Sequence, residues 1–470
     1  ADYVRTPVGA GYALENRLAM TRATDDALGI VNFVRLAPFF TDFRQGLAAV
    51  CARPDPRIAL LTQGRYNQSY AEQAHLARYL GILLVEGQDL TVREGQLYVR
   101  TIEGVKRVDG LWRRMGTDLL DPLAFDARST IGVPDIFEAM RKGGLVIANW
   151  PGAGVLETPA LAAFLPRLCR KLLGEPLRIP NVATWWCGQD KERAHVREQA
   201  DRLAIGSAFG LAVPAIPHGR ARLASRLSPD ERAAFLAELD QRPMDYIGQE
   251  LVKLSTTPAL VDGALRPRPF ILRAFLARDA DGQWKAMPGG FARLAAHDDM
   301  RAVLMGQGDM SADVCIVADE PQTSVVTLDS GAPVAIRRVA GTLPSKAADN
   351  FFWLARYLER GEMVLRMIRV LIGGSIEGEA ASALDRPTLG RVADTLVAWG
   401  SARKDKLGEG TAKLCVHALG DPEMPGSVQS LFEAAEAIGR GLRERLAVDF
   451  WRLLSRQIDR VSEARDAQLM

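Results

Sequence analysis

The sequence predicts a mixed α/β part followed by an all-α part. Residues 58–85 show a strand, a helix and a second strand in succession, which is the pattern of a layered α/β domain. Residues 244–295 carry antiparallel strand patterns, whereas only helical periodicity follows residue 340. The predicted domains are an α/β (α+β) domain over residues 1–335 and a helical bundle, itself partial, over residues 340–470.

The composition is that of a globular protein without a strong charge bias. Hydrophobic residues make up 48% and charged residues 25% of the 470 positions. Lys plus Arg minus Asp plus Glu is 59 − 57, or +2. A balance so close to zero argues against nucleic acid or an anionic membrane as a partner. The excess of Arg, Ala and Gly is typical of a GC-rich bacterial genome.

Cysteine and histidine usage argues against stabilising disulfides and metal centres. The five cysteines form no CxxC pair and the five histidines are isolated, which predicts neither a disulfide framework nor a zinc site. No apolar run has membrane-spanning length and no signal peptide opens the sequence, so we expect a cytoplasmic protein. Because the chain starts at Ala1 in the middle of a pattern, we expect its true N-terminus to lie upstream.

The elements of the first half follow from apolar periodicity. Residues 9–50 predict helices, the second of them broken by Pro38, and Tyr70–Leu80 is the helix of the βαβ unit. Glu94-Gly95 marks a hairpin turn. Two further strands are expected in VDGLWRR and GGLVIANW, and two further helices at 135–142 and 157–173.

The second half combines a hairpin with a long amphipathic helix. Asp281-Gly282 predicts a turn between two of the antiparallel strands. The helix near residue 350 has an apolar stripe with the spacing of a core-facing side. Its charges are either surface pairs or a polar cluster, and the like-charged Arg356 and Arg360 imply an acidic neighbour or an incoming anion.

The opening stretch RTPVGAGYALENR contains Gly9-Ala10-Gly11 ahead of a predicted helix. Glycine-rich loops before helices bind phosphate through their backbone amides. The stretch has no Gly-Lys-Ser/Thr, so a plain structural turn is the favoured alternative.

Two arginines and two aspartates stand together in LWRRMGTDLLDPLAF. Arg113 and Arg114 follow a strand and suit phosphate or carboxylate clamping, since a guanidinium is a rigid bidentate donor. Asp118 or Asp121 would orient them or bind Mg²⁺. The alternative is a cluster of surface salt bridges.

A second glycine-rich turn and a group of strands offer further candidates. The turn Asn149–Glu157 either presents its amides to an anion or is an ordinary β–α connection. A group of polar residues lines either a nucleotide cleft or a solvated face: Gln249 and Glu250 on one strand, and Arg273 and Arg293 on later strands. No nearby basic partner is evident for Cys187, which is therefore not expected to be a nucleophile.

Six segments occur in a characteristic order: RTPVGAGYALENRLAMTRA, RRMGTDLLDPL, GGLVIANWPGAGVLE, LLGEPLRIPNVATWWCGQ, DYIGQELVKLSTTP and LRAFLARDADGQWKAMPGGFARLA. Together they resemble the circularly permuted ATP-grasp type 2 family, over about residues 1–330. LPSKAADNFFWLARYLERGE is similar to the start of the helical Alpha-E domain often fused to that family. Members are longer at both ends, so the chain is expected to be a piece of a longer protein.

The resemblance implies ATP bound between two α+β subdomains. A carboxylate would attack the γ-phosphate, and an amine would displace the resulting acyl phosphate, with Mg²⁺ and cationic donors on the phosphates. The matching motifs imply adenine contacts at the hinge Gln249, Glu250 and Leu251. They also imply phosphate or substrate contacts by Arg113, Arg114, Asp118, Arg273 and Arg293, and nucleotide contacts by Asn149, Gly152 and Gly154.

The alignment also places the opening stretch. In this family RTPVG follows the strand whose Glu and Asn hold the metals, so the glycine loop is expected near the site without being a phosphate loop. Ala1 and Tyr3 stand where that Glu and Asn are expected, which leaves Asp2 as the candidate metal ligand.

Two further segments depart from the family pattern. Residues 213–223 lack the expected phosphate-binding lysine, and Arg220 or Arg222 would have to replace it. The run GQGDMSADVCIV has Asp309, Ser311 and Asp313 in place of a Gly-Gly-Ser-Lys-Asp pattern. Each such loss removes charge stabilisation from the expected transition state.

Two functions therefore follow from the sequence. The first is an ATP-dependent carboxylate–amine ligase acting on a small molecule or peptide. The second is a catalytically depleted ATP-grasp that binds or scaffolds other molecules, with the helical domain supplying an interface for a protein partner.

Overall fold

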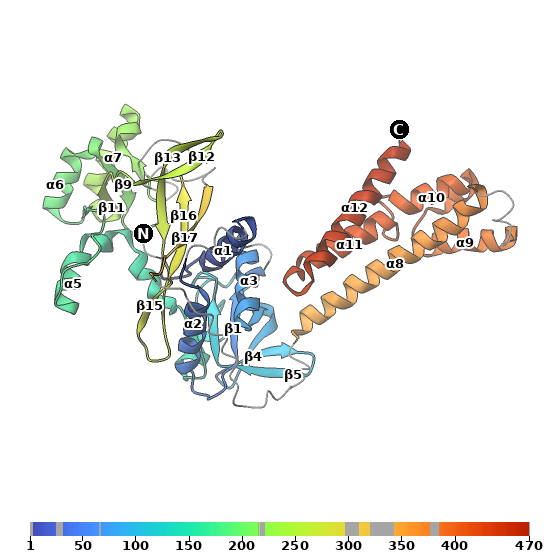
Figure 1. Ribbon diagram of the computed structural model, residues 1–470, viewed down its shortest axis with the longest axis horizontal. Helices are drawn as coiled ribbons and strands as arrows, with labels where there is room; N and C mark the ends of the chain where they lie inside the picture. Colours follow the sequence, from blue (N-terminus) through green and yellow to red (C-terminus); the bar gives the residue numbers. More distant parts are fainter. Residues whose placement is uncertain are drawn as a thin grey trace.

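The computed structural model has an α/β body and a helical arm (Figure 1), in the order that the sequence predicts. It describes residues 3–24, 32–64, 67–214, 216, 221–296, 310–319, 343–376 and 385–469. The predicted boundary near residue 340 falls within 320–342, outside the described residues, and stays a prediction.

A four-stranded parallel sheet forms the base of the body, in the order β2-β1-β6-β7. Every residue of its central strand β1 is buried, as expected for a sheet covered on both faces. The predicted strand–helix–strand unit is therefore confirmed. The strands are β1 (Ile58–Thr62), β2 (Leu83–Glu86), β6 (Gly110–Arg113) and β7 (Val146–Ala148), and the helix is α3 (Tyr70–Leu80).

One face of this sheet is covered by a small antiparallel sheet and a short helix, which share a core with it. Glu94 and Gly95 both have positive φ, 52° and 74°, and form the predicted two-residue turn. The elements are β3 (Leu90–Arg93), β4 (Gln96–Thr101), β5 (Gly104–Val108) and α4 (Ile136–Arg141).

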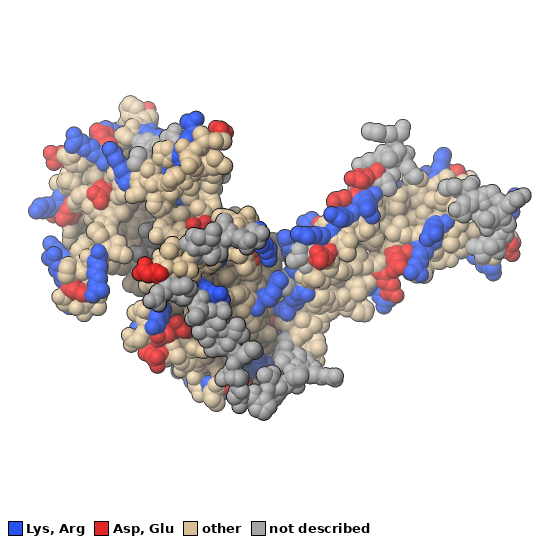
Figure 2. Space-filling model, in the orientation of Figure 1, with Lys and Arg blue, Asp and Glu red and all other residues tan. Residues whose placement is uncertain are grey.

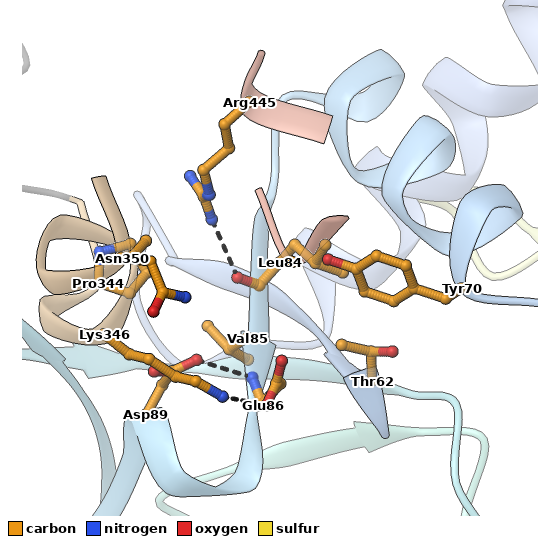
Figure 3. A pocket seen from close by; sticks show the side chains of 12 residues that line it. Thr62, Tyr70, Leu84, Val85, Glu86, Asp89, Pro344, Lys346, Asn350 and Arg445 are labelled. Carbon is orange, nitrogen blue, oxygen red and sulfur yellow. Dashed lines mark hydrogen bonds and ion pairs between the residues drawn. The ribbon is translucent and has the colours of Figure 1, made fainter. Parts of the chain in front are cut away.

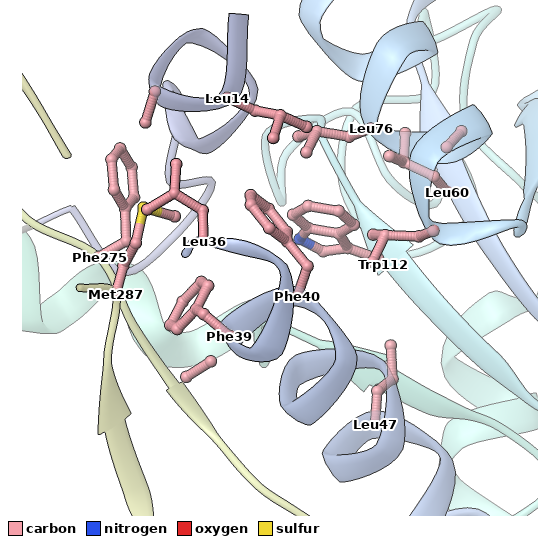
Figure 4. Close-up of a cluster of buried hydrophobic side chains, with 14 of the residues drawn as sticks. Leu14, Leu36, Phe39, Phe40, Leu47, Leu60, Leu76, Trp112, Phe275 and Met287 are labelled. Carbon is pink, nitrogen blue, oxygen red and sulfur yellow. The ribbon is translucent and has the colours of Figure 1, made fainter. Parts of the chain in front are cut away.

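The other face is covered by α3 together with two helices from the start of the chain, α1 (Ala10–Thr24) and α2 (Ala37–Ala49). Their buried side chains meet Leu60 and Trp112 of the parallel sheet on one side and Phe275 and Met287 on the other (Figure 4). Pro38 lies in the first turn of α2 and begins that helix instead of breaking it, because a first-turn residue needs no N–H for the helix.

A second four-stranded sheet, antiparallel and ordered β10-β9-β11-β8, carries its own helices and core. The predicted helix 157–173 is only partly correct. Pro159 and Pro166 divide the region into 3-10 turns at Pro151–Glu157 and Pro159–Ala163 and the helix α5 (Leu165–Leu173). The other elements are β8 (Thr184–Trp186), α6 (Asp190–Glu198), β9 (Leu203–Ser207), β10 (Arg222–Leu223), α7 (Pro229–Gln241) and β11 (Tyr246–Glu250).

The third sheet, antiparallel and ordered β12-β13-β16-β17, lies between the second sheet and the base of the body (Figure 1). The predicted turn at Asp281-Gly282 closes a separate hairpin that packs on α2. The strands are β12 (Thr256–Val261), β13 (Ala264–Arg273), β16 (Gly289–Leu294) and β17 (Met310–Cys315), with β14 (Leu276–Arg278) and β15 (Trp284–Ala286) in the hairpin.

The arm consists of helices around a core of its own. Its long first helix, α8 (Ser345–Ile376), runs from the body to the far end of the arm (Figure 1). The remaining helices are α9 (Arg386–Ala398), α10 (Thr411–Gly420), α11 (Val428–Arg440) and α12 (Val448–Leu469). Over the part of the chain that the structure describes, no helix is both long and apolar enough to cross a bilayer.

The arm meets the body where β1 and β2 end (Figure 3). Lys346 Nζ lies 2.6 Å from Glu86 Oε2, and Arg445 donates to the carbonyl of Leu84 at 3.3 Å. These contacts surround a cavity of about 30 Å³, which is room for about two waters. The junction is therefore a small polar contact and not a ligand-sized pocket.

Gly46 provides a test of how α2 packs on the hairpin. A Cβ at this position would lie 2.0 Å from the backbone oxygen of Arg278. We expect Gly46→Ala to lower the free energy of unfolding by about 1–3 kcal/mol through overpacking. Denaturant unfolding followed by circular dichroism measures this.

Gly373→Ala is the matched control, because nothing lies within 4 Å of a Cβ added there in α8. Its effect on stability is expected to be neutral or favourable, since alanine is the better helix former. Equal unfolding midpoints for Gly46→Ala and the unaltered protein would contradict the packing described.

Candidate functional site

The first turn of α1 binds an anion that belongs to the protein itself. The carboxylate of Glu72, on α3, accepts hydrogen bonds from the backbone amides of Gly9 at 2.7 Å and Gly11 at 3.2 Å. Amides at a helix N-terminus favour negative charge. The glycine-rich stretch therefore has the geometry of an anion site, and Glu72 occupies it.

Glu72 is paired with Arg114 in the interior. Arg114 Nη2 lies 2.8 Å from Glu72 Oε2, and the two side chains are 2% and 0% exposed. Arg114 also donates to the carbonyl of Pro7. Burial lowers the pKa of Arg114, and the charge of Glu72 opposes that shift. The pair thus fixes both sides of the turn Pro7–Gly11.

Further donors and acceptors hold this turn and the residues before it. Asn149 Nδ2 donates to the carbonyl of Val4, and Arg273 Nη1 donates to that of Val8 at 3.1 Å. Glu157 accepts from the amide of Val4 at 2.7 Å. Elements distant in sequence therefore converge on one short segment, Val4–Gly11, which we call the opening segment.

Arg113 and Asn149 have structural partners. Arg113 is fully buried and donates to the carbonyls of Asn149 and Met115, each at 2.8 Å. Burial lowers its pKa, and the nearby charge of Arg5 adds to the shift. The predicted Gly152 and Gly154 lie in the 3-10 turn that follows, with the side chain of Arg5 beside Gly154.

The two aspartates of the motif LWRRMGTDLLDPLAF do not pair with its arginines. Asp118 is exposed. Asp121 is buried and accepts from the amides of Leu123 and Phe137 at 2.9 and 3.4 Å. Asp121 therefore organises its own loop, and only Asp118 remains open to solvent.

The predicted hinge lies at the end of β11. Gln249 Nε2 donates to Thr184 Oγ1 at 3.1 Å, and the Glu250 carboxylate accepts from the amide of Ala183 at 2.9 Å. The Glu250 amide donates to the carbonyl of Ala183 at 3.0 Å. Leu251 follows, half-buried, at the start of the connection to the third sheet. The side chains of Gln249 and Glu250 thus bind Thr184, the first residue of β8, and Ala183, the residue before it.

Arg273 and Arg293 lie on one face of the third sheet. Arg273 is opposite Phe291 in the strand register, and Arg293 follows two residues later on the same strand as Phe291. The guanidinium of Arg273 lies over the ring of Tyr3, 5.0 Å from its centre. Arg273 thus links this face to the start of the chain.

The same face carries the predicted Ser311 and Asp313, and both contact α1. Asp313 Oδ2 lies 2.6 Å from Arg17 Nε in a pair whose side chains are 6% and 8% exposed. Ser311 accepts from Asn16 at 2.8 Å. The carboxylate of Asp313, which stands in the run that departs from the family pattern, is therefore already paired with Arg17.

The described residues contain no cluster of candidate metal ligands. Asp2, Arg220 and Asp309 lie outside the described residues. Within the described ranges no group of three or more His, Cys, Asp or Glu side chains is placed to hold a metal ion. Arg222, the remaining candidate for the missing lysine, is paired with Glu231 at 2.9 Å. Mg²⁺ binding stays a prediction.

Glu72 and Arg17 are the two residues that the sequence interpretation overlooked. Glu72 lies four residues before Leu76, on the buried side of α3. An acidic residue on the apolar side of a helix is a signal of a buried partner, since burying an unpaired charge is costly. Arg17 is the corresponding basic residue on the buried side of α1.

Thiol chemistry is not supported at Cys187. The side chain is fully buried, and burial raises its pKa to about 12. A thiol with such a pKa has little thiolate near neutral pH.

Comparison with known families gives two matches along the chain. Residues 1–295 match the model of the circularly permuted ATP-grasp type 2 family. Residues 343–469 match Alpha-E, described as a predicted alpha-helical domain with a conserved ER motif.

The similar curated proteins are bacterial and uncharacterized. Rv2411c of Mycobacterium tuberculosis is 32% identical over 350 residues, 74% of this chain and 62% of its own length. Rv2567 of the same species is 30% identical over 479 residues, 97% of this chain and 52% of its own length. Protein sll0335 of Synechocystis is 31% identical over 68% of this chain and 66% of its own length. The chain thus spans about half to two thirds of these relatives.

The buried pair predicts a large effect of removing one partner. We expect Glu72→Ala to lower the free energy of unfolding by about 3–5 kcal/mol, because Arg114 is left buried without its counter-charge. Equilibrium unfolding in urea measures the change.

Two further variants make this measurement specific. Glu72→Ala/Arg114→Met should recover part of the loss, since it also removes the stranded charge. Glu138→Ala, which breaks an exposed pair with Arg141, should leave the midpoint unchanged. A Glu72→Ala midpoint equal to that of Glu138→Ala would show that the pair does not hold the fold.

Proposed function

The chain belongs to the circularly permuted ATP-grasp type 2 family, and from this premise we propose that its α/β body is an ATP-dependent carboxylate–amine ligase. In the proposed reaction a carboxylate oxygen of a small molecule or peptide bonds to the γ-phosphorus of ATP while the bond to ADP breaks. An amine nitrogen then bonds to the acyl carbon, phosphate leaves, the nitrogen loses a proton, and an amide results.

The single observation that supports this proposal is the arrangement of Arg273. Arg273 lies on the third sheet, which follows the hinge at the end of β11 along the chain. It contacts both the ring of Tyr3 and the carbonyl of Val8. ATP-grasp chemistry depends on positioned cations that stabilise charge on the transferring phosphoryl group. We therefore assign Arg273 to phosphate binding between the two sheets, with Arg293 beside it on the same face.

The other candidate residues take roles that fit their contacts. The backbone at Gln249, Glu250 and Leu251 would contact adenine, because it ends the strand that leads into the third sheet. Arg113, Arg114 and Asn149 would act as positioning residues, since their donors bind backbone carbonyls of the body. Asp118 is left as the exposed acidic group of the motif, for substrate contact. Gly152 and Gly154 remain proposed nucleotide contacts.

A second candidate function is a catalytically depleted ATP-grasp that binds or scaffolds. Three observations favour it. Tyr3 stands where a metal-binding Asn is expected, and its ring covers Arg273. Asp313 is paired with Arg17, and Arg222 is paired with Glu231. Each of these groups would have to release its partner before it contributed to phosphoryl transfer.

Calorimetric titration with Mg²⁺ and ATP tests nucleotide binding. We expect binding by the unaltered protein and at least tenfold weaker binding by Arg273→Ala, because a phosphate-binding cation is lost. Arg278→Ala is the matched control, since Arg278 stacks on Trp284 of the hairpin, and it should bind as the unaltered protein does.

The outcomes separate the two functions. Release of ADP in the presence of candidate carboxylates and amines supports the ligase. Nucleotide binding without ADP release supports the depleted protein. No binding at millimolar ATP, or equal losses in Arg273→Ala and Arg278→Ala, would refute the assignment of Arg273.

A further inference from the structure

Among the residues that the structure describes, the other helices of the arm leave one side of α8 uncovered. The buried residues Leu354, Val364, Ile368 and Leu371 belong to cores shared with the other helices of the arm. Figure 1 shows α11 and α12 along one side of α8. The opposite side includes Phe352, which is 54% exposed.

The exposed residues of this side form a regular seam. They follow one another at intervals of four and three residues, which is the spacing of a coiled-coil contact line. The seam residues, all of them exposed, are Phe352, Arg356, Glu359, Met363, Arg366 and Val370. Asp349, also exposed, lies one turn before Phe352. Apolar and charged residues are thus interspersed along a face that a second helix would fit.

The seam is complementary to itself when reversed. If a second α8 packs antiparallel about a two-fold axis between residues 357 and 358, Phe352 meets Met363 and Arg356 meets Glu359. The same axis places Asp349 opposite Arg366. A two-fold interface requires each patch to complement its own copy, and all three pairings meet this requirement.

We propose that the chain forms a homodimer through this antiparallel contact of α8 with α8 of a second copy. The seam has two acidic and two basic residues among these pairs, so it has no net charge to attract an anionic surface. On the face seen in Figure 2, acidic and basic side chains are likewise interspersed along the arm. The Alpha-E description names a conserved ER motif, and Glu359 begins one of the two Glu-Arg pairs in the matched range.

The expected dimer is weak. The stretch from Asp349 to Arg366 spans eighteen residues, whose first and last Cα atoms lie about 26 Å apart along the helix axis. Exposed ion pairs contribute little each, so association rests mainly on the Phe352 and Met363 contacts. We expect the monomer and dimer to exchange in the micromolar range, below the stability of a standard protein interface.

Sedimentation velocity of the full chain over a range of concentrations tests the proposal. Glu359→Arg places an arginine opposite Arg356 of the other copy on both sides of the two-fold axis, at the centre of the seam. Its dimer should dissociate at least tenfold more readily than that of the unaltered protein. The double variant Arg356→Glu/Glu359→Arg restores opposite charges and should restore the dimer.

Matched controls exclude a general loss of structure. Arg356 and Glu359 also pair within α8 at 3.6 Å, a contact worth a few tenths of a kcal/mol, so melting temperatures should stay close together. Arg440→Glu reverses a charge on α11, off the seam, and should dimerise normally. Met363→Glu should be monomeric.

Several results would overturn the proposal. These are a monomer at several hundred micromolar, a dimer that Met363→Glu leaves intact, or a double variant that fails to recover. Because no nucleotide is present in these measurements, their failure is independent of the proposed ligase activity.

Discussion

The carboxylate of Glu72 is the group on which the arrangement of the body depends. It sits where α1, α3 and β6 meet, and it accepts hydrogen bonds from the start of α1 and from Arg114. A buried charge is tolerated only when its partners are complete. The carboxylate therefore requires α1, the opening segment and the arginine after β6 to be in place together. Arg113, Asn149 and Arg273 add their contacts around this point.

The contacts of Glu72 show that a glycine-rich loop before a helix can bind a side chain of the same protein instead of a ligand. Gly9 has a φ of 117°, and a Cβ on it would lie 2.6 Å from the ring of Phe291. The glycines are thus needed for close packing, and their amides are neutralised by an internal carboxylate. A loop of this composition is an anion site in physical terms, and only the tertiary structure decides whether the anion is a ligand or a side chain.

Much of the fold could be predicted from local pattern. The continuous apolar strands β1 and β2, the hairpin at Glu94-Gly95 and the helical periodicity of the arm all depend on residues near one another in sequence. Pro38 and the region 157–173 were less predictable, because a proline is compatible with either the start or the end of a helix. Contacts such as Arg17 with Asp313 join residues almost three hundred positions apart, which no local pattern encodes.

The length of α8 gives the small junction with the body a mechanical consequence. The helix has 32 residues, so it acts as a lever about 48 Å long, and a tilt of about 10° at Lys346 displaces its tip by about 8 Å. The side-chain contacts at the junction include one partly exposed ion pair, Lys346 with Glu86, and the strength of such a pair falls as salt rises. Leverage would therefore enlarge any small change in this one ion pair into a displacement of several ångströms at the far end of the arm.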